Sequence, residues 1–174
     1  MSTKKFDFPF YDCETKLKDK VFLRQPKGND WNDYTWGEVG LTARKLATGL
    51  KSLGLKEKSH IGLVSKNCSE WIIADLAITM AGYVSVPFFP TLKSNEMNHL
   101  IEFGDVEALF VGKLEGNWDE MKKGIDTENL PIIAFPHYEG NSKVDEGHQW
   151  HDFINKFDPQ TENYYPAVDD VWTI

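Results

Sequence analysis

The sequence contains little cysteine and no motif built on it. Its 174 residues include two cysteines, Cys13 and Cys68, which form no CxxC pair. A disulfide framework is therefore not expected, and this cysteine usage favours a reducing cytosol. The opening MSTKKFDFPFYDCETKLKDK also lacks the apolar core of a signal peptide, so we do not expect secretion.

Clustered positive charge and glycine-rich phosphate motifs are missing as well. The formal net charge is −8, and Lys and Arg are spread along the chain, which argues against nonspecific nucleic-acid binding. Neither G-x-G-x-x-G nor G-x-x-x-x-G-K-[ST] occurs. We therefore do not expect the chain to cradle a triphosphate by itself.

No apolar run is long enough and free enough of glycine and proline for a membrane span. The most apolar stretch, Trp71 to Pro90, carries the single charge of Asp75 in 20 residues, but Gly82 and Pro87 interrupt it. A membrane helix would not end in the strand-like YVSVPFF. The stretch is better explained as a buried helix followed by a buried strand, and Asp75 then needs a polar partner or a solvated rim.

Catalytic and metal-binding constellations are also scarce. His148-x-x-His151 resembles a metal motif most, but no second ligand pair has a zinc spacing, and both histidines fall on the polar side of the expected helix. Cys68 stands at a helix start without a neighbouring base, so we interpret it as a small packing residue. The sequence predicts no catalytic residue, no cofactor-binding residue and no metal site.

The composition is that of one compact domain. Hydrophobic residues make up 41% and charged residues 26%, which are ordinary globular values. A chain of this length buries roughly 70% of the surface of its unfolded form.

The segment HIGLVSKNCSEWIIADLAITMAGYVSVPFFPTL predicts one parallel βαβ unit. His60–Val64 is a β-branched strand, and Asn67 with Glu70 has the spacing of a capping box for a helix that begins near Cys68. Gly82 supplies a left-handed stop. Tyr83–Phe89 is apolar on both faces, as in a strand covered by helices on both sides.

The remaining pattern repeats this alternation of strands and helices. We expect a hairpin from 21–24 and 33–35, helices over 35–53, 94–104 and 148–157 and one beginning at Asn117, strands over 107–111 and 131–135, and an exposed loop over 137–147. The predicted fold class is α/β: a mostly parallel sheet with right-handed crossovers and helices on both faces.

Several of these segments resemble a known family. KNCSEWIIADLAI, AGYVSVPFFPTL and FGDVEALFVG, with YTWGEV and LATGLKSLGL before them, are similar in order and spacing to the N-terminal subdomain of AMP-forming acyl-CoA synthetases, most of all long-chain fatty acid–CoA ligases. The resemblance covers residues 21–174. It implies a lead-in segment over 1–20, followed by the N-terminal α/β portion of the AMP-binding domain.

The resemblance also implies where the chemistry lies. A complete ligase joins a long-chain fatty acid to coenzyme A through an acyl-adenylate, with ATP, Mg²⁺ and CoA as cofactors. DVWTI at 170–174 is similar to the strand that leads into the family's phosphate loop. We therefore expect an N-terminal fragment that is inactive alone, has the rest of the synthetase as its partner, and is cytoplasmic and peripheral to membranes at most.

One segment is a candidate wall for the acyl or pantetheine channel in such a ligase. The exit of the second strand is apolar and stiffened by prolines, and the proposed wall is Val86, Pro87, Phe88, Phe89, Pro90 and Thr91. The same residues also fit simple core and turn positions.

Two alternative functions remain open at this stage. The chain can be an independent, non-catalytic binding or interaction module on the same scaffold. It can also be a flavodoxin-like nucleotide binder, since open parallel sheets bind ligands beyond the carboxyl ends of their strands. For the expected fragment, apolar surface exposed where the missing subdomain would dock can drive self-association.

Overall fold

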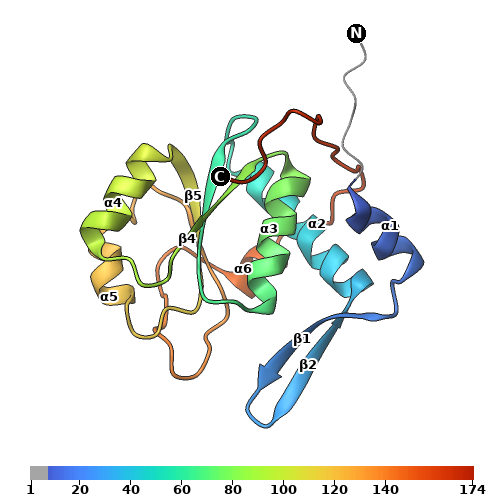
Figure 1. Cartoon of the computed structure of the whole chain (residues 1–174), viewed down its shortest axis with the longest axis horizontal. Helices are drawn as coiled ribbons and strands as arrows, with labels where there is room; N and C mark the ends of the chain where they lie inside the picture. The colour runs from blue at the N-terminus through green and yellow to red at the C-terminus, as the bar shows by residue number, and fades with distance from the viewer. Residues whose placement is uncertain (1–7) are drawn as a thin grey trace.

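The sheet expected from the sequence is present in the computed structural model, which describes residues 8–174 (Figure 1). Five parallel strands lie in the order β4-β3-β5-β6-β7. Their bounds are β3 His60–Val64, β4 Val84–Phe88, β5 Val106–Val111, β6 Ile132–Ala134 and β7 His148–Gln149. The α/β class with a parallel sheet is confirmed.

Helices cover both faces of this sheet, as expected (Figure 1). One face packs against α2 (Trp36–Ser52), α3 (Ser69–Ala81) and α6 (Trp150–Ile154), and α1 (Pro9–Lys16) joins the same core. The other face packs against α4 (Ser94–Phe103) and α5 (Trp118–Met121), and the 3₁₀ helix η1 (Lys122–Gly124) contacts these two helices. The strands between the two cores are thus apolar on both sides, which explains their continuous hydrophobic runs.

The predicted hairpin and the helix after it are confirmed. β1 (Val21–Lys27) pairs antiparallel with β2 (Asp30–Thr35), and α2 follows at once. Thr35 caps α2: the Glu38 amide donates to the Thr35 hydroxyl at 3.2 Å, and the Thr35 amide donates to the Glu38 carboxylate at 2.8 Å. This reciprocal pair satisfies two amides that the helix itself leaves free.

The βαβ unit is confirmed, but its helix begins differently from the prediction. Gly82 ends α3 with a φ of 84°, in the left-handed region that glycine tolerates. The residue before the helix is Cys68, not Asn67, and no capping box forms. Instead, the Ser69 amide donates to the side-chain oxygen of Gln25 in β1 at 3.0 Å. A long-range cap therefore replaces the local one.

Three further local predictions were wrong in detail. Ser94 is the first residue of α4 and not its cap; the Lys93 amide donates to Glu96 at 2.8 Å. The helix expected over 148–157 is divided into the short strand β7 and α6, because His148 pairs with Ile133 of β6. The strand expected over 170–174 is reduced to one parallel bridge between Thr173 and Ser85.

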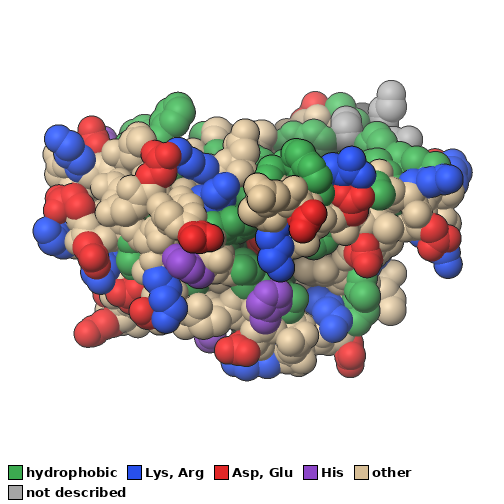
Figure 2. Space-filling view, turned by 90° about the horizontal axis from the view of Figure 1, so that it is seen from below, with side chains coloured by type: hydrophobic (Ala, Val, Ile, Leu, Met, Phe, Trp, Pro, Cys, Tyr) green, Lys and Arg blue, Asp and Glu red, His purple; other side chains and the backbone are tan. Residues whose placement is uncertain are grey.

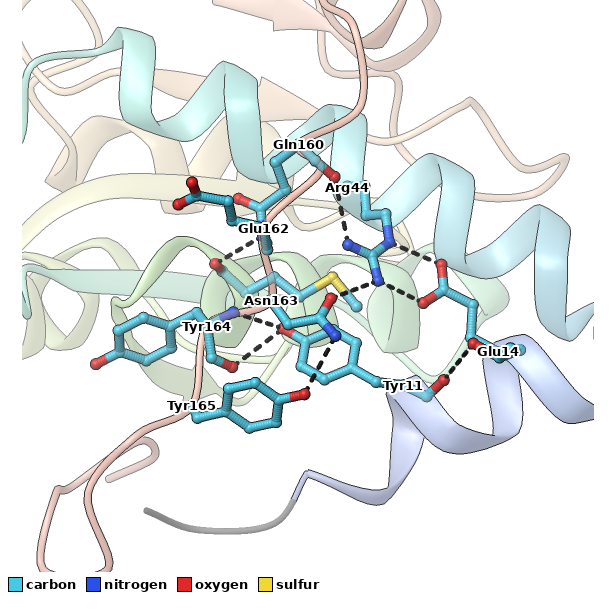
Figure 3. A network of polar contacts seen from close by, with 10 residues as sticks. Tyr11, Glu14, Arg44, Gln160, Glu162, Asn163, Tyr164 and Tyr165 are labelled. Atoms are coloured by element: carbon cyan, nitrogen blue, oxygen red, sulfur yellow. Dashed lines mark hydrogen bonds and ion pairs between the residues drawn. The ribbon is translucent and has the colours of Figure 1, made fainter. Parts of the chain in front are cut away.

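A polar network fixes the segment that leads to this bridge (Figure 3). Arg44 of α2 donates to the Gln160 carbonyl at 3.3 Å and to the Asn163 side chain at 2.8 Å. Tyr11 of α1 donates its hydroxyl hydrogen to the Tyr164 carbonyl at 3.2 Å and accepts from the Tyr164 amide at the same distance. Segments from opposite ends of the described chain are thus joined along α1 and α2.

Residues 1–7 of the expected lead-in segment lie outside the described residues, and most of the remainder forms α1. Within residues 8–174, none of the helices combines the length and the apolar character that a bilayer crossing requires.

Candidate functional site

The carboxyl ends of β3 and β5 meet where the strand order reverses. β3 pairs with β4 on one side and with β5 on the other, so the chains leaving β3 and β5 diverge to opposite faces. Open parallel sheets bind ligands at this position because a crevice opens between the diverging loops. The loops concerned are residues 65–68 and 112–114.

Hydrogen bonds hold these two loops together. The Lys113 amide donates to the hydroxyl of Ser65 at 2.9 Å, and the Lys66 amide donates to the Lys113 carbonyl at 2.9 Å. Lys66 also forms an ion pair with Glu115. The backbone that borders the crevice is therefore fixed in place.

A cavity of about 610 Å³ opens beside these loops. This volume is in the range of small-molecule sites. It combines an aromatic and proline wall with two lysines, and we call it the strand-end cavity; it is lined by Ser65, Lys66, Asn67, Trp71, Pro87, Phe88, Phe89, Pro90 and Lys113.

The structure places four of the six predicted wall residues in this lining: Pro87, Phe88, Phe89 and Pro90. Phe88 is 8% exposed and belongs to the core, whereas Phe89 is 77% exposed at the cavity rim. Val86 is buried in the sheet and Thr91 is not part of the lining. The placement fits a wall, and the role of these residues stays a prediction.

Asn117 positions the loop after β4, a role that the sequence did not indicate. The N-x-x-E pattern predicts Asn117 as a cap of the following helix, but its side chain makes no such bond. Its amide nitrogen donates to the carbonyls of Pro90 at 3.3 Å and Leu92 at 2.9 Å instead. Asn117 thus ties α5 to the proline-rich wall.

A buried carboxylate lies at the start of α3. Glu70 is 7% exposed and accepts hydrogen bonds from the Ser69 hydroxyl, at 3.1 Å, and from the Tyr138 hydroxyl. Burial and the adjacent Glu70 carboxylate raise the pKa of Tyr138 far above its usual value, so Tyr138 stays a neutral donor. This contact fastens the loop after β6 to α3.

Cys68 lies beside this cluster and behaves as a packing residue. It is 7% exposed, and burial raises the pKa of its thiol to about 11, with a further contribution from Glu70. A thiol with this pKa is almost fully protonated at neutral pH and is a weak nucleophile. The interpretation from sequence agrees with this environment.

The sequence singles out the pair His148 and His151 as well as the charged residue Asp75. His148 lies in β7 and His151 in α6, and within residues 8–174 no group of three or more potential ligands is arranged to hold a metal ion. Asp75 is half-buried on α3 beside Ser85, and burial raises the pKa of its carboxyl group. Asp75 therefore has a polar neighbour as well as partial solvent access.

Comparison with known proteins identifies the family of this fold and cavity. A model described as AMP-binding enzyme matches residues 10–168. The chain belongs to this AMP-binding enzyme family. The matched range includes β1 through α6 and both loops that border the strand-end cavity.

The curated relatives of this family member include acyl-CoA ligases. It is 32% identical over 102 residues to "Long-chain-fatty-acid–CoA ligase heimdall" of Drosophila melanogaster, covering 57% of this chain and 15% of that protein. It is 33% identical over 81 residues to "Long chain acyl-CoA synthetase 6, peroxisomal" of Arabidopsis thaliana, covering 47% of this chain and 12% of that protein. The matches thus span a small part of each relative.

Solved structures of two CoA ligases share the fold. An anthranilate CoA ligase in complex with anthranoyl-AMP superposes with a TM-score of 0.79 at 17% identity, over 95% of this chain and 30% of that one. A benzoate CoA ligase from Burkholderia xenovorans gives 0.77 at 16% identity, over 94% of this chain and 31% of that one. The two likenesses establish the fold of this chain.

Proposed function

We propose that this chain supplies the N-terminal α/β portion of a long-chain fatty acid–CoA ligase. The observation that carries the proposal is the family match over residues 10–168, together with curated relatives named as long-chain ligases. The proposed overall reaction joins a fatty acid and coenzyme A at the expense of ATP, with release of AMP and pyrophosphate.

In this proposal, the strand-end cavity contributes part of the acyl or pantetheine channel. Phe89 and Trp71 supply apolar contact area, and Pro87 and Pro90 stiffen the wall between them. Lys66 and Lys113 lie on the same cavity and suit the polar end of an elongated ligand. The wall acts by positioning, so none of these residues is assigned a chemical step.

The proposal assigns ATP, Mg²⁺ and CoA to a complete ligase and none of them to this chain alone. The proposal therefore includes the expectation that the chain by itself does not convert fatty acid to acyl-CoA. The remaining nucleotide-binding and C-terminal parts are its proposed partners, and its proposed location is the cytosol. Self-association through exposed apolar side chains such as Phe89 and Ile174 also stays a prediction.

A segment exchange tests this assignment. Residues 21–174 replace the corresponding segment of the Drosophila ligase, and AMP release is measured with palmitate, ATP, Mg²⁺ and CoA. We expect palmitate-dependent turnover. We also expect Phe89→Asp in the exchanged segment to raise KM for palmitate at least about fivefold, because it places a charge on the apolar wall.

Phe103 is the matched control for this exchange. It is 81% exposed on α4, and it is not part of the strand-end cavity. Phe103→Asp should leave KM unchanged. A folded hybrid that releases no AMP while the parent ligase does, or equal effects of both substitutions, would overturn the proposal.

A further inference from the structure

A second and larger cavity lies between the β1–β2 hairpin and the loop that follows β6. Its volume is about 830 Å³. The hairpin contributes Lys27 and Tyr34, the loop contributes His137 and Tyr138, and Lys113 borders it from the end of β5. We call it the hairpin cavity. Figure 2, which views the molecule from below relative to Figure 1, shows histidine side chains on this face with both basic and acidic side chains beside them.

Four basic side chains line the hairpin cavity, and none is neutralised by a carboxylate. Within residues 8–174, no ion pair joins Lys27, Lys113, His137 or His151 to an acidic side chain. The chain as a whole carries a formal charge of −8, so carboxylates are plentiful elsewhere. Basic groups gathered in a concave site without acidic partners favour an anion. His137 has a neutral partner, since its Nε2 lies 3.0 Å from the Asn141 carbonyl oxygen.

The acidic side chains that line the hairpin cavity do not cancel its positive charge. Glu70 is 7% exposed, and its carboxylate is occupied by Ser69 and Tyr138. Glu139 lies on the exposed loop and forms no ion pair within the described residues. Glu139 is therefore the single solvent-facing carboxylate of the lining.

Lys113 is held in place before any ligand arrives. Its amide and carbonyl are bonded to Ser65 and Lys66, and its ammonium nitrogen lies 4.8 Å from the centre of the Tyr138 ring. Tyr138 is in turn fixed by Glu70. A cation positioned in this way loses little side-chain entropy on binding.

We propose that the hairpin cavity binds a phosphorylated small molecule. Lys27 and Lys113 contact the phosphate oxygens, because a lysine ammonium is a compact charge that suits phosphate. The aromatic faces of Tyr34 and Tyr138 contact the organic part, for which the volume leaves room. This site shares Lys113 with the strand-end cavity, but Lys27, Tyr34 and Tyr138 line the hairpin cavity and not the strand-end cavity. The proposal does not depend on the ligase assignment.

Titration calorimetry with inorganic pyrophosphate on the whole chain tests the proposal. We expect saturable binding at low ionic strength and a decline with added salt. Lys27→Gln and Lys113→Gln should each weaken binding about tenfold, because each removes one charge-assisted hydrogen bond. Lys56→Gln removes the same charge from an exposed turn before β3, at the opposite end of the sheet, and should leave the affinity unchanged.

Lys66→Gln separates the two cavities, because Lys66 lines only the strand-end cavity and Lys27 lines only the hairpin cavity. If Lys66→Gln weakens pyrophosphate binding and Lys27→Gln does not, the anion sits in the strand-end cavity and the inference is wrong. Absence of saturable binding at millimolar pyrophosphate, with the circular dichroism of the folded chain intact, overturns it as well. Neither result bears on fatty-acid turnover.

Discussion

The guanidinium group of Arg44 donates two hydrogen bonds to the carboxylate of Glu14. Nε lies 2.8 Å from Oε1 and Nη2 lies 2.7 Å from Oε2, and both side chains are 15% exposed. The same guanidinium holds the 160–163 segment. Arg44 thus joins α1, α2 and the chain that leads to Thr173 (Figure 3).

Replacing Arg44 should loosen this junction. Arg44→Met retains most of the aliphatic volume but leaves Glu14 without its partner in a largely water-excluded place. We expect the free energy of unfolding in urea to fall by about 2 kcal/mol, below the range for fully buried pairs. Amide exchange should speed up over residues 160–165.

Arg24 provides the matched control, because it also forms a two-bond pair, with Asp33, at 2.6 and 2.7 Å. That pair is exposed on the hairpin, where solvent screens it. Arg24→Met should therefore leave the unfolding midpoint unchanged. Equal losses in the two variants would show that Arg44 has no special structural role.

Gly147 is expected to be the least replaceable glycine in the loop before β7. It has a φ of 72°, and an added Cβ would overlap the carbonyl oxygen of Ile132 in β6. Gly147→Ala should cost about 3 kcal/mol of stability, since strain and a backbone clash add. Gly140→Ala, with a φ of 77° but open space around the Cβ, should cost only about 1 kcal/mol. Matching losses in thermal unfolding would contradict this difference.

Cys68 should resist alkylation as long as the chain is folded. Its pKa of about 11 leaves roughly one thiolate in a thousand at pH 8. In a Cys13→Ser background, we expect iodoacetamide to react at least about a hundredfold more slowly with the folded chain than with the urea-unfolded chain. The folded-state rate should rise about tenfold per pH unit up to that pKa. Comparable rates in the two states would mean that the thiol is not buried and that its pKa is not raised.

The elements that the sequence predicted well are those with local signals. The Thr35–Glu38 capping box lies within four consecutive residues, and Gly82 ends α3 through its own backbone. The Gln25–Ser69 bond joins residues 44 apart, and Asn117 reaches Pro90 across 27 positions. No local pattern contains such contacts, because they exist only after the sheet has formed.

In the candidate site, too, the features with local sequence signals were predictable and those built from distant segments were not. Pro87 to Pro90 were recognisable as an apolar, rigid strand exit, and the structure places them at a cavity. The hairpin cavity was not predictable, since its lining comes from loops that follow different strands. The helical spacing of Trp150, Phe153, Ile154 and Phe157 predicts a helix that begins at His148. Pairing with β6 makes His148 a strand residue instead, and no local pattern contains that contact.

Turnover by the purified chain alone tests the central claim most directly. Palmitate, ATP, Mg²⁺ and CoA are supplied, and AMP and palmitoyl-CoA are measured together by chromatography. A scaffold that needs the other parts of a ligase should release no AMP above the level seen without protein. Equal amounts of AMP and palmitoyl-CoA, rising in proportion to the concentration of this chain, would contradict the account.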